Sequence, residues 1–337
     1  MCGIAGIYSH KSVATELYES IIHLQHRGQD AAGIMTYDNR MHKEKGIGLA
    51  KEVFNESNME LLTGNIGISH NRYPTHGGFS HGEVQPFWTS VPYGIALAHN
   101  GNLTNYQSLA EEITNKDSRY LNTNSDSEVL LHYFADLLHT NNPPEDSEEF
   151  FYLLCSAVTK IFKHVKGAYS VVSIVIGKGL VVFRDPRGIR PLVKGERSNG
   201  NGGKDYIFAS ENTMFYSLGF EPKGTVLPGE LIYVDEAGKV DYSQIRNNPY
   251  RFNEYFMSDT SITNSQEPLL TNDGVPLKES LRKSLRRTKI RSFLLILPPL
   301  LFLLLMFVTP IGSLLSRSVD DIQINKVFPQ TFAQYEV

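Results

Sequence analysis

The residue best placed to do chemistry is Cys2, which follows the initiator methionine. An initiator methionine is normally removed when the second residue is small, so we expect the mature chain to begin at Cys2. Removal would leave a thiol and a free α-amine on one residue. Because an α-amine titrates near pH ~7.7–8.0, it can act as the general base for its own side chain. Cys2 is thus predicted to cleave an amide through an acyl-enzyme, although a cysteine at this position alone is more often just a small N-terminal residue.

Five ordered blocks of sequence that include Cys2 favour the catalytic interpretation of this residue over the ordinary one. They are residues 2–7 (CGIAGI), 26–34 (HRGQDAAGI), 70–77 (HNRYPTHG), 98–103 (AHNGNL) and 124–128 (NSDSE). Together they resemble the class II glutamine amidotransferases, which are N-terminal-nucleophile hydrolases. Each block alone would be weak evidence, but five in this order are highly specific. The resemblance implies a four-layer αββα sandwich that releases ammonia from the side-chain amide of glutamine.

The resemblance also implies a role for each polar cluster. Asn100 and Gly101 would donate to the oxyanion of the tetrahedral intermediate, where losing one donor typically costs ~10²–10³ in rate. Arg72 would bind the α-carboxylate of glutamine and Asp126 its α-ammonium group. Ordinary alternatives exist for all of them, because Asn-Gly is a common type I′ turn, arginine is often a surface charge, and an acid is favoured in the first turn of a helix.

The remaining candidate residues would complete the pocket. The resemblance implies that Arg27 and Gly28 line it through backbone groups, and glycine suits a place where backbone segments approach closely. Thr75 and His76 are expected to shape the part that holds glutamine. No metal is predicted, because the histidines lack the spacing of metal ligands. We interpret them as structural or surface residues: His23, His26, His70, His81 and His99.

Later segments indicate a branch of the family. Residues 184–192 (RDPRGIRPL), 209–212 (ASEN) and 227–231 (LPGEL) resemble the amidophosphoribosyltransferases of purine synthesis, which pass ammonia to phosphoribosyl pyrophosphate on a second domain. The glucosamine-6-phosphate synthase branch shares the glutaminase blocks and is the alternative. No phosphoribosyltransferase domain is found after residue 248. No cofactor is therefore expected in this chain, since Mg²⁺ and any iron–sulfur cluster would belong to the missing domain.

The elements that position these residues follow from apolar spacing and turn residues. Strands are expected at 2–8, 66–70 and 94–99, hairpins at 33–45, 169–183 and 230–242, and helices at 13–24, 125–138 and 150–165. Ser125 and Glu128 are predicted to form a capping box for the second of these helices. Many strands with few long helices between them favour largely antiparallel sheets. The predicted fold class is α+β, with residues 1–245 as the glutaminase domain.

Composition excludes several other classes. The net charge of −4 offers no electrostatic basis for binding nucleic acid. Cys2 and Cys155 are the only cysteines, so neither a disulfide framework nor a multi-cysteine metal site can form, and a reducing compartment is expected. The N-terminal region lacks the basic and apolar segments of a cleavable signal peptide.

The C-terminal quarter has a different composition. Residues 246–277 are polar and turn-rich and are predicted to be a linker or fusion junction. Residues 278–291 form a basic juxtamembrane segment, residues 292–316 are uncharged and long enough for a transmembrane helix, and residues 317–337 form a short extracytoplasmic tail. The positive-inside rule then places the N-terminus in the cytoplasm. Residues 268–316 also resemble the N-terminus of an ABC transporter permease, which suggests a fusion.

The sequence thus predicts a glutaminase that turns glutamine into glutamate and ammonia through a Cys2 thioester, anchored at the cytoplasmic face of the inner membrane. Its expected partners are glutamine and the lipid bilayer, and a separate ammonia-acceptor domain or chain and an oligomeric state are left open. Two alternatives remain open. One is a non-catalytic truncated or fused membrane protein, and the other is a transporter fragment in which the amidotransferase portion is incidental.

Overall fold

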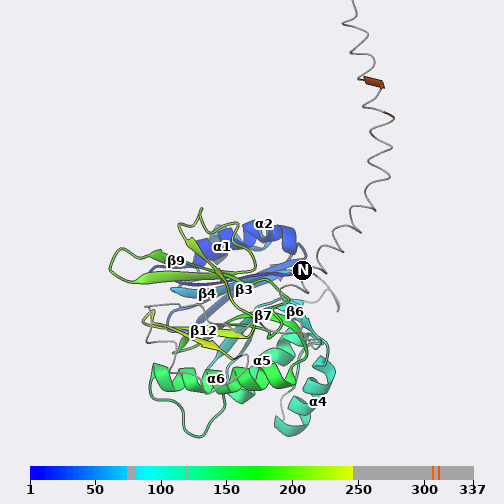
Figure 1. Ribbon diagram of the computed structural model, residues 1–337, viewed down its shortest axis with the longest axis vertical. Coiled ribbons are helices and arrows are strands. Elements are labelled where there is room, and N and C mark those ends of the chain that lie inside the picture. Colours follow the sequence, from blue (N-terminus) through cyan, green and yellow to red (C-terminus); the bar gives the residue numbers. More distant parts are fainter. Residues whose placement is uncertain (74–80, 118–119, 246–305, 307–309, 312–337) are drawn as a thin grey trace, which may run out of the picture. The chain divides into compact units, whose positions relative to one another are not determined.

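The structure is a computed structural model that describes residues 1–73, 81–117 and 120–245, together with positions 306, 310 and 311. By its internal contacts the chain divides into two units, Met1–Met257 and Ser258–Val337. The candidate site lies in the first unit. Figure 1 draws the ribbon of the described elements with their labels.

Two antiparallel sheets form the centre of the first unit. The first has the strand order β11-β9-β10-β1-β4-β2-β3 and the second the order β13-β12-β8-β7-β6-β5. The strands of the first sheet are β1 (Gly3–Tyr8), β2 (Ala31–Tyr37), β3 (Met41–Ile47), β4 (Ile66–Arg72), β9 (Val193–Ser198), β10 (Lys204–Ala209) and β11 (Glu221–Thr225). Those of the second are β5 (Phe87–Thr89), β6 (Ile95–Leu103), β7 (Gly167–Val175), β8 (Gly179–Arg184), β12 (Glu230–Asp235) and β13 (Val240–Gln244).

Helices cover the outer face of each sheet. The helices are α1 (Ala14–His23), α2 (Ala50–Val53), α3 (Glu56–Met59), α4 (Tyr106–Asp117), α5 (Asp126–Leu137) and α6 (Ser147–His164), with short 3₁₀ turns η1 (Gln25–Arg27) and η2 (His81–Glu83). Helices α1 and α2 pack on the first sheet, while α5 and α6 pack on the second. The order helix, sheet, sheet, helix is the predicted four-layer αββα sandwich, and the α+β class is confirmed.

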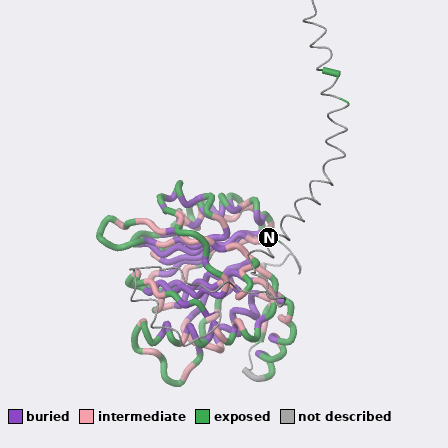
Figure 2. The backbone as a smooth tube through the Cα atoms, viewed as in Figure 1, coloured by how far each residue is buried: buried purple, intermediate pink, exposed green. Residues whose placement is uncertain are grey.

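Three apolar clusters separate these layers, and Figure 2 shows the buried backbone concentrated in the two sheets. One lies beneath α1, where Leu17 and Ile21 pack against the first sheet. The second lies between the sheets and includes Ile68 and Val172. The third lies between the second sheet and helices α4–α6. Because successive side chains of a strand point to opposite faces, each sheet contributes to two clusters.

The predicted elements correspond to β1, α1, the β2–β3 hairpin, β4, β6, α5, α6 and the β7–β8 and β12–β13 hairpins. All strand pairs in the described part of the chain that carry a register are antiparallel, as predicted. Strands β5, β9, β10 and β11 and helices α2, α3 and α4 were not predicted. Helix α4 is polar over most of its length, and β5, α2 and α3 are only three or four residues long.

The capping prediction for α5 is half correct. Ser125 is the N-cap, and its hydroxyl accepts a hydrogen bond from the Ser127 N–H. Glu128 does not return to the Ser125 N–H as a capping box requires. Its carboxylate instead accepts from the backbone N–H groups of Asn122 and Thr123, so it fastens the preceding loop to the helix.

Among the described residues no helix is long and apolar enough to cross a bilayer. The predicted transmembrane segment at 292–316 lies outside the described residues except at positions 306, 310 and 311. The predicted linker at 246–277, basic segment at 278–291 and tail at 317–337 lie outside them as well.

Candidate active site

Cys2 lies at the end of β1, beside the end of β4. The pairing of Gly3 with Asn71 brings the cysteine next to Arg72 and Tyr73. The Cys2 Sγ is 3.5 Å from the Tyr73 N–H nitrogen, which donates to it, and 3.7 Å from the Tyr73 carbonyl oxygen. Burial raises the pKa of the Cys2 thiol, whereas the Tyr73 N–H and, more weakly, the positive charge of Arg72 act against that rise. The N–H of Tyr73, the residue after β4, thus offsets part of the effect by which burial disfavours the thiolate.

Arg27 holds the cysteine by its side chain. Its Nε donates to the Cys2 carbonyl oxygen over 3.0 Å, and its Nη1 forms an ion pair with Glu211. The predicted backbone role of Arg27 stays a prediction, and the structure adds a side-chain contact, because Arg27 lies in η1 and is only 8% exposed. Burial lowers the pKa of the Met1 α-amine, the neighbouring Cys2 thiol opposes that shift, and the charges of Arg27 and Arg190 add to it.

Gly28 is required by a close approach of two backbone segments. A Cβ at this position would lie 2.5 Å from the carbonyl carbon of Arg72 and 2.8 Å from that of Asn71. The φ angle of −165° is extended and available to any residue, so the clash alone excludes a side chain. Gly28 therefore packs directly against the end of β4, although it is not among the residues that line the cavity at Cys2.

A cavity of about 300 Å³ opens beside the thiol. Four of the predicted residues line it, namely Cys2, Arg72, Gly101 and Asp126. Its size lies at the lower end of the range for small-molecule sites. The first two residues come from the first sheet, and the other two come from β6 and the start of α5. The cavity is therefore assembled from both halves of the sandwich.

The two predicted charged residues of the cavity, Arg72 and Asp126, have partners that fix them. Arg72 Nη2 donates to Glu83 Oε2 over 2.6 Å, and both side chains are nearly buried. Asp126 Oδ2 accepts from the Leu103 N–H over 2.9 Å. Glu83 also lines the cavity but was not predicted, since no sequence pattern links it to Arg72.

Asn100 and Gly101 face opposite sides of β6. Ala96 and Ala98 belong to the cluster between the sheets, so Asn100 shares their face, whereas Gly101 faces the cavity. Asn100 is 1% exposed, and its Nδ2 has no hydrogen-bond partner among the described residues. A buried donor without a partner carries a desolvation cost of about 1–3 kcal/mol. Nδ2 is thus a donor whose bonding capacity is not used within the described structure.

A buried network supports the cavity floor. Gln85 Nε2 donates to Ser127 Oγ over 2.9 Å, and Gln85 Oε1 accepts from the His99 N–H over 2.7 Å. His99 Nδ1 lies 2.9 Å from the same Ser127 oxygen. The network links β6 to the first turn of α5, which carries Asp126. Sequence reasoning missed Gln85 and Ser127, because nothing in their spacing indicates that they meet.

The last predicted site residues are Thr75 and His76, and the last prediction is that the site holds no metal ion. Thr75 and His76 lie outside the described residues. Within the residues described, no group of three or more histidine, cysteine, aspartate or glutamate side chains could hold a metal ion.

Comparison with known proteins identifies related sequences. A family model for the "Glutamine amidotransferase domain" matches residues 70–217. The amidophosphoribosyltransferase of Pseudomonas aeruginosa is 46% identical over 250 residues, which is 74% of this chain and 49% of that protein. The Escherichia coli enzyme of the same name is 44% identical over 252 residues, with the same coverage of both chains.

A solved structure agrees with these sequences. The glutamine phosphoribosylpyrophosphate amidotransferase from B. subtilis, complexed with ADP and GMP, superposes with a TM-score of 0.62 at 30% identity. The match covers 73% of this chain and 50% of that one. The chain thus spans about half the length of the relatives it matches.

With two antiparallel sheets, the cavity at Cys2 and these relatives, the chain contains a glutamine amidotransferase domain of the N-terminal-nucleophile class. Within that class, the domain is of the amidophosphoribosyltransferase type. The resemblance of residues 268–316 to a transporter permease receives no support from these comparisons.

Proposed function

We propose that the domain hydrolyses glutamine to glutamate and ammonia. The observation that carries this proposal is one cavity lined by a thiol, a guanidinium and a carboxylate, those of Cys2, Arg72 and Asp126. Arg72 would pair with the α-carboxylate of glutamine and Asp126 with its α-ammonium. The side-chain amide would then extend toward Cys2.

The reaction would proceed through a thioester. After removal of Met1, the amine of Cys2 would take the thiol proton, and Sγ would attack the amide carbon. Asn100 Nδ2 and the Gly101 N–H would stabilise the oxyanion. The protonated amine would next give its proton to the leaving ammonia, and water would hydrolyse the thioester. The partnerless state of Nδ2 supports this role, because a new oxyanion would supply the missing acceptor.

The direct test is release of glutamate and ammonia by the purified full chain. We expect release that stops in Cys2→Ala, and equal release by the two proteins would refute the proposal. Mass spectrometry of the N-terminus tests the non-catalytic alternative. Retained Met1 or an acetylated Cys2 would remove the amine that serves as base, and would favour that alternative.

We propose further that the ammonia passes to a phosphoribosyl acceptor in purine synthesis, on a domain or chain other than the glutaminase domain at residues 1–245. Support comes from the relatives, which are named amidophosphoribosyltransferases and of which the matched region is about half the length. The same names favour this branch over the glucosamine-6-phosphate synthase type. The test is to mix the chain with a separately expressed phosphoribosyltransferase domain and to measure phosphoribosylamine. Formation of phosphoribosylamine would support the proposal, and a glutaminase rate that does not change when the domain is added would count against it.

We also propose that residues 292–316 anchor the chain to the inner membrane, with the glutaminase domain on the cytoplasmic side. The support is the uncharged length of this segment and the seven lysines and arginines in 278–291. Fractionation of cells that express the full chain should place it with membranes. Deletion of residues 292–316 should release it, and a full chain found entirely in the supernatant would refute the anchor.

A further inference from the structure

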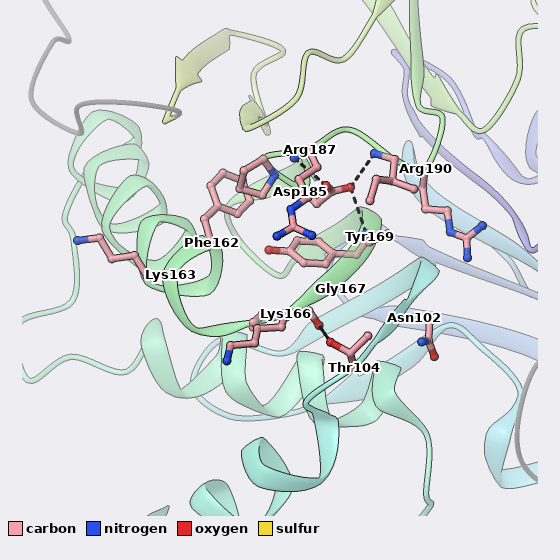
Figure 3. Close-up of a pocket in the computed structure, with 14 residues that line it drawn as sticks. Asn102, Thr104, Phe162, Lys163, Lys166, Gly167, Tyr169, Asp185, Arg187 and Arg190 are labelled. Atoms are coloured by element: carbon pink, nitrogen blue, oxygen red, sulfur yellow. Dashed lines mark hydrogen bonds between the residues drawn. The ribbon is translucent and has the colours of Figure 1, made fainter. Parts of the chain in front are cut away.

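A second and larger cavity lies apart from the thiol. Its volume is about 670 Å³, within the range of small-molecule sites. It is formed by the end of α6, the start of β7 and the turn at residues 185–190 that follows β8 (Figure 3). Asn102 and Thr104 line both cavities, whereas Cys2, Arg72 and Asp126 line only the first. Nothing in the proposed glutaminase reaction uses the second cavity.

The charge of this cavity is strongly positive. Four cationic side chains line it, namely Lys163, Lys166, Arg187 and Arg190. In the described part of the chain none of the four forms an ion pair. In Figure 3 the Arg187 side chain lies beside the Tyr169 ring, whereas the ends of Lys163 and Arg190 point away from it, so an anion in the cavity would meet Arg187 directly and the other cations through their longer-range field.

The one acidic residue of the cavity, Asp185, does not neutralise them. Its Oδ1 accepts from the backbone N–H groups of Arg187 and Gly188 over 2.8 and 2.9 Å. Its Oδ2 accepts from the N–H groups of Ile189 and Tyr169 over 3.2 and 3.3 Å. The carboxylate is fully buried and serves to hold the turn at 185–190 against β7.

Two buried donors at the cavity have no partner among the described residues. The Tyr169 side chain is 1% exposed, and its hydroxyl makes no hydrogen bond there. Arg190 Nε is in the same situation. In Figure 3 the Tyr169 ring lies between Arg187 and Lys166, so the hydroxyl is placed within the cationic lining. An acceptor oxygen of a ligand in the cavity would satisfy the Tyr169 hydroxyl.

We propose that this cavity binds a small phosphate monoester. A phosphoryl group carries several acceptor oxygens and a double negative charge, which suits guanidinium and ammonium groups together with a phenol donor. Phe162, Val165 and Ile189 add an apolar portion to the lining, suited to the organic part of the ester. The proposal does not depend on glutamine hydrolysis.

The test is calorimetric titration of the full chain with glycerol 3-phosphate, inorganic phosphate and glycerol. We expect glycerol 3-phosphate to bind with a Kd on the order of 1 mM or tighter, inorganic phosphate to bind more weakly, and glycerol not to bind. Equal binding of the ester and glycerol, or no binding of either phosphate, would overturn the proposal. Binding of inorganic phosphate as tight as that of the ester would overturn the assignment to a monoester.

Matched variants locate the site. Arg187→Gln and Tyr169→Phe should each weaken binding about tenfold, the effect of one hydrogen bond of about 1.4 kcal/mol. Arg40→Gln and Tyr216→Phe, at exposed positions elsewhere, should leave it unchanged. Without ligand, Tyr169→Phe should keep or raise the Tm, because it removes a buried hydroxyl that lacks a partner. Binding that survives both cavity substitutions would place the phosphate elsewhere and refute the assignment.

Discussion

Replacement of Gly28 by alanine offers a sharp test of the proposed active site. The new Cβ would lie 2.5 Å from the Arg72 carbonyl carbon, where ordinary contact begins at 3.4 Å, so the two segments must separate by about 0.9 Å. The neighbouring atoms are backbone and cannot rotate away. Arg72 ends β4, and its neighbour Tyr73 donates to Cys2 Sγ, so the shift displaces both the substrate anchor and the thiol. A misplacement of about 1 Å costs on the order of 10² in rate.

The assay is kcat/KM for glutamate release from glutamine, with the Tm measured in parallel. Gly28→Ala should lose about 100-fold in kcat/KM while remaining folded. Gly203→Ala is the control, since its Cβ would meet only the end of the Asn199 side chain in an exposed loop, and it should retain full activity. A folded Gly28→Ala protein with the kcat/KM of the parent would show that the contact with β4 does not set the site geometry.

Three other outcomes are expected. Asn100→Ala should lower kcat about 10²- to 10³-fold with little change in KM, and an unchanged kcat would exclude Asn100 from the oxyanion site. Arg72→Lys should raise KM for glutamine about tenfold, through loss of bidentate pairing, and a constant KM would contradict that role. Burial lowers the pKa of His70 to about 3, so between about pH 6.5 and pH 3 the unfolded chain binds one proton more than the folded chain. The stability from this group is complete above about pH 6.5 and falls by about 1.4 kcal/mol per pH unit below it. The free energy of unfolding, measured with urea, should fall less steeply between about pH 5.5 and about pH 4 in His70→Gln than in the parent protein. The exposed variant His23→Gln should show the same pH dependence as the parent.

Sequence reasoning predicted the fold well because the signals are local. Apolar alternation in β4 and β6 and the helical stripe of α1 each specify their own element, and turn residues mark the hairpins. Helix α4 was not predicted, because its sequence is mostly polar and its few apolar residues show only a weak helical periodicity. Its helical state depends on packing against α5, which no short window of sequence contains.

The candidate site was predictable only in part, for the same reason. The resemblance supplied Cys2, Arg72 and Asp126, and these residues do line one cavity. The contacts that hold them were missed. Arg27 meets the Cys2 carbonyl by its side chain, and Glu83 in η2 meets Arg72 at the end of β4, which are separate elements. Such contacts are set by tertiary packing.

The two sheets must approach each other closely for this site to exist. Cys2 and Arg72 come from the first sheet, while Gly101 and Asp126 come from the second sheet and its helix. Directly beneath β1, a Cβ at Gly6 would lie 3.2 Å from the Cβ of Val172 on β7, so glycine permits the short separation there. The distance between thiol and oxyanion donors is thus controlled by packing between the sheets.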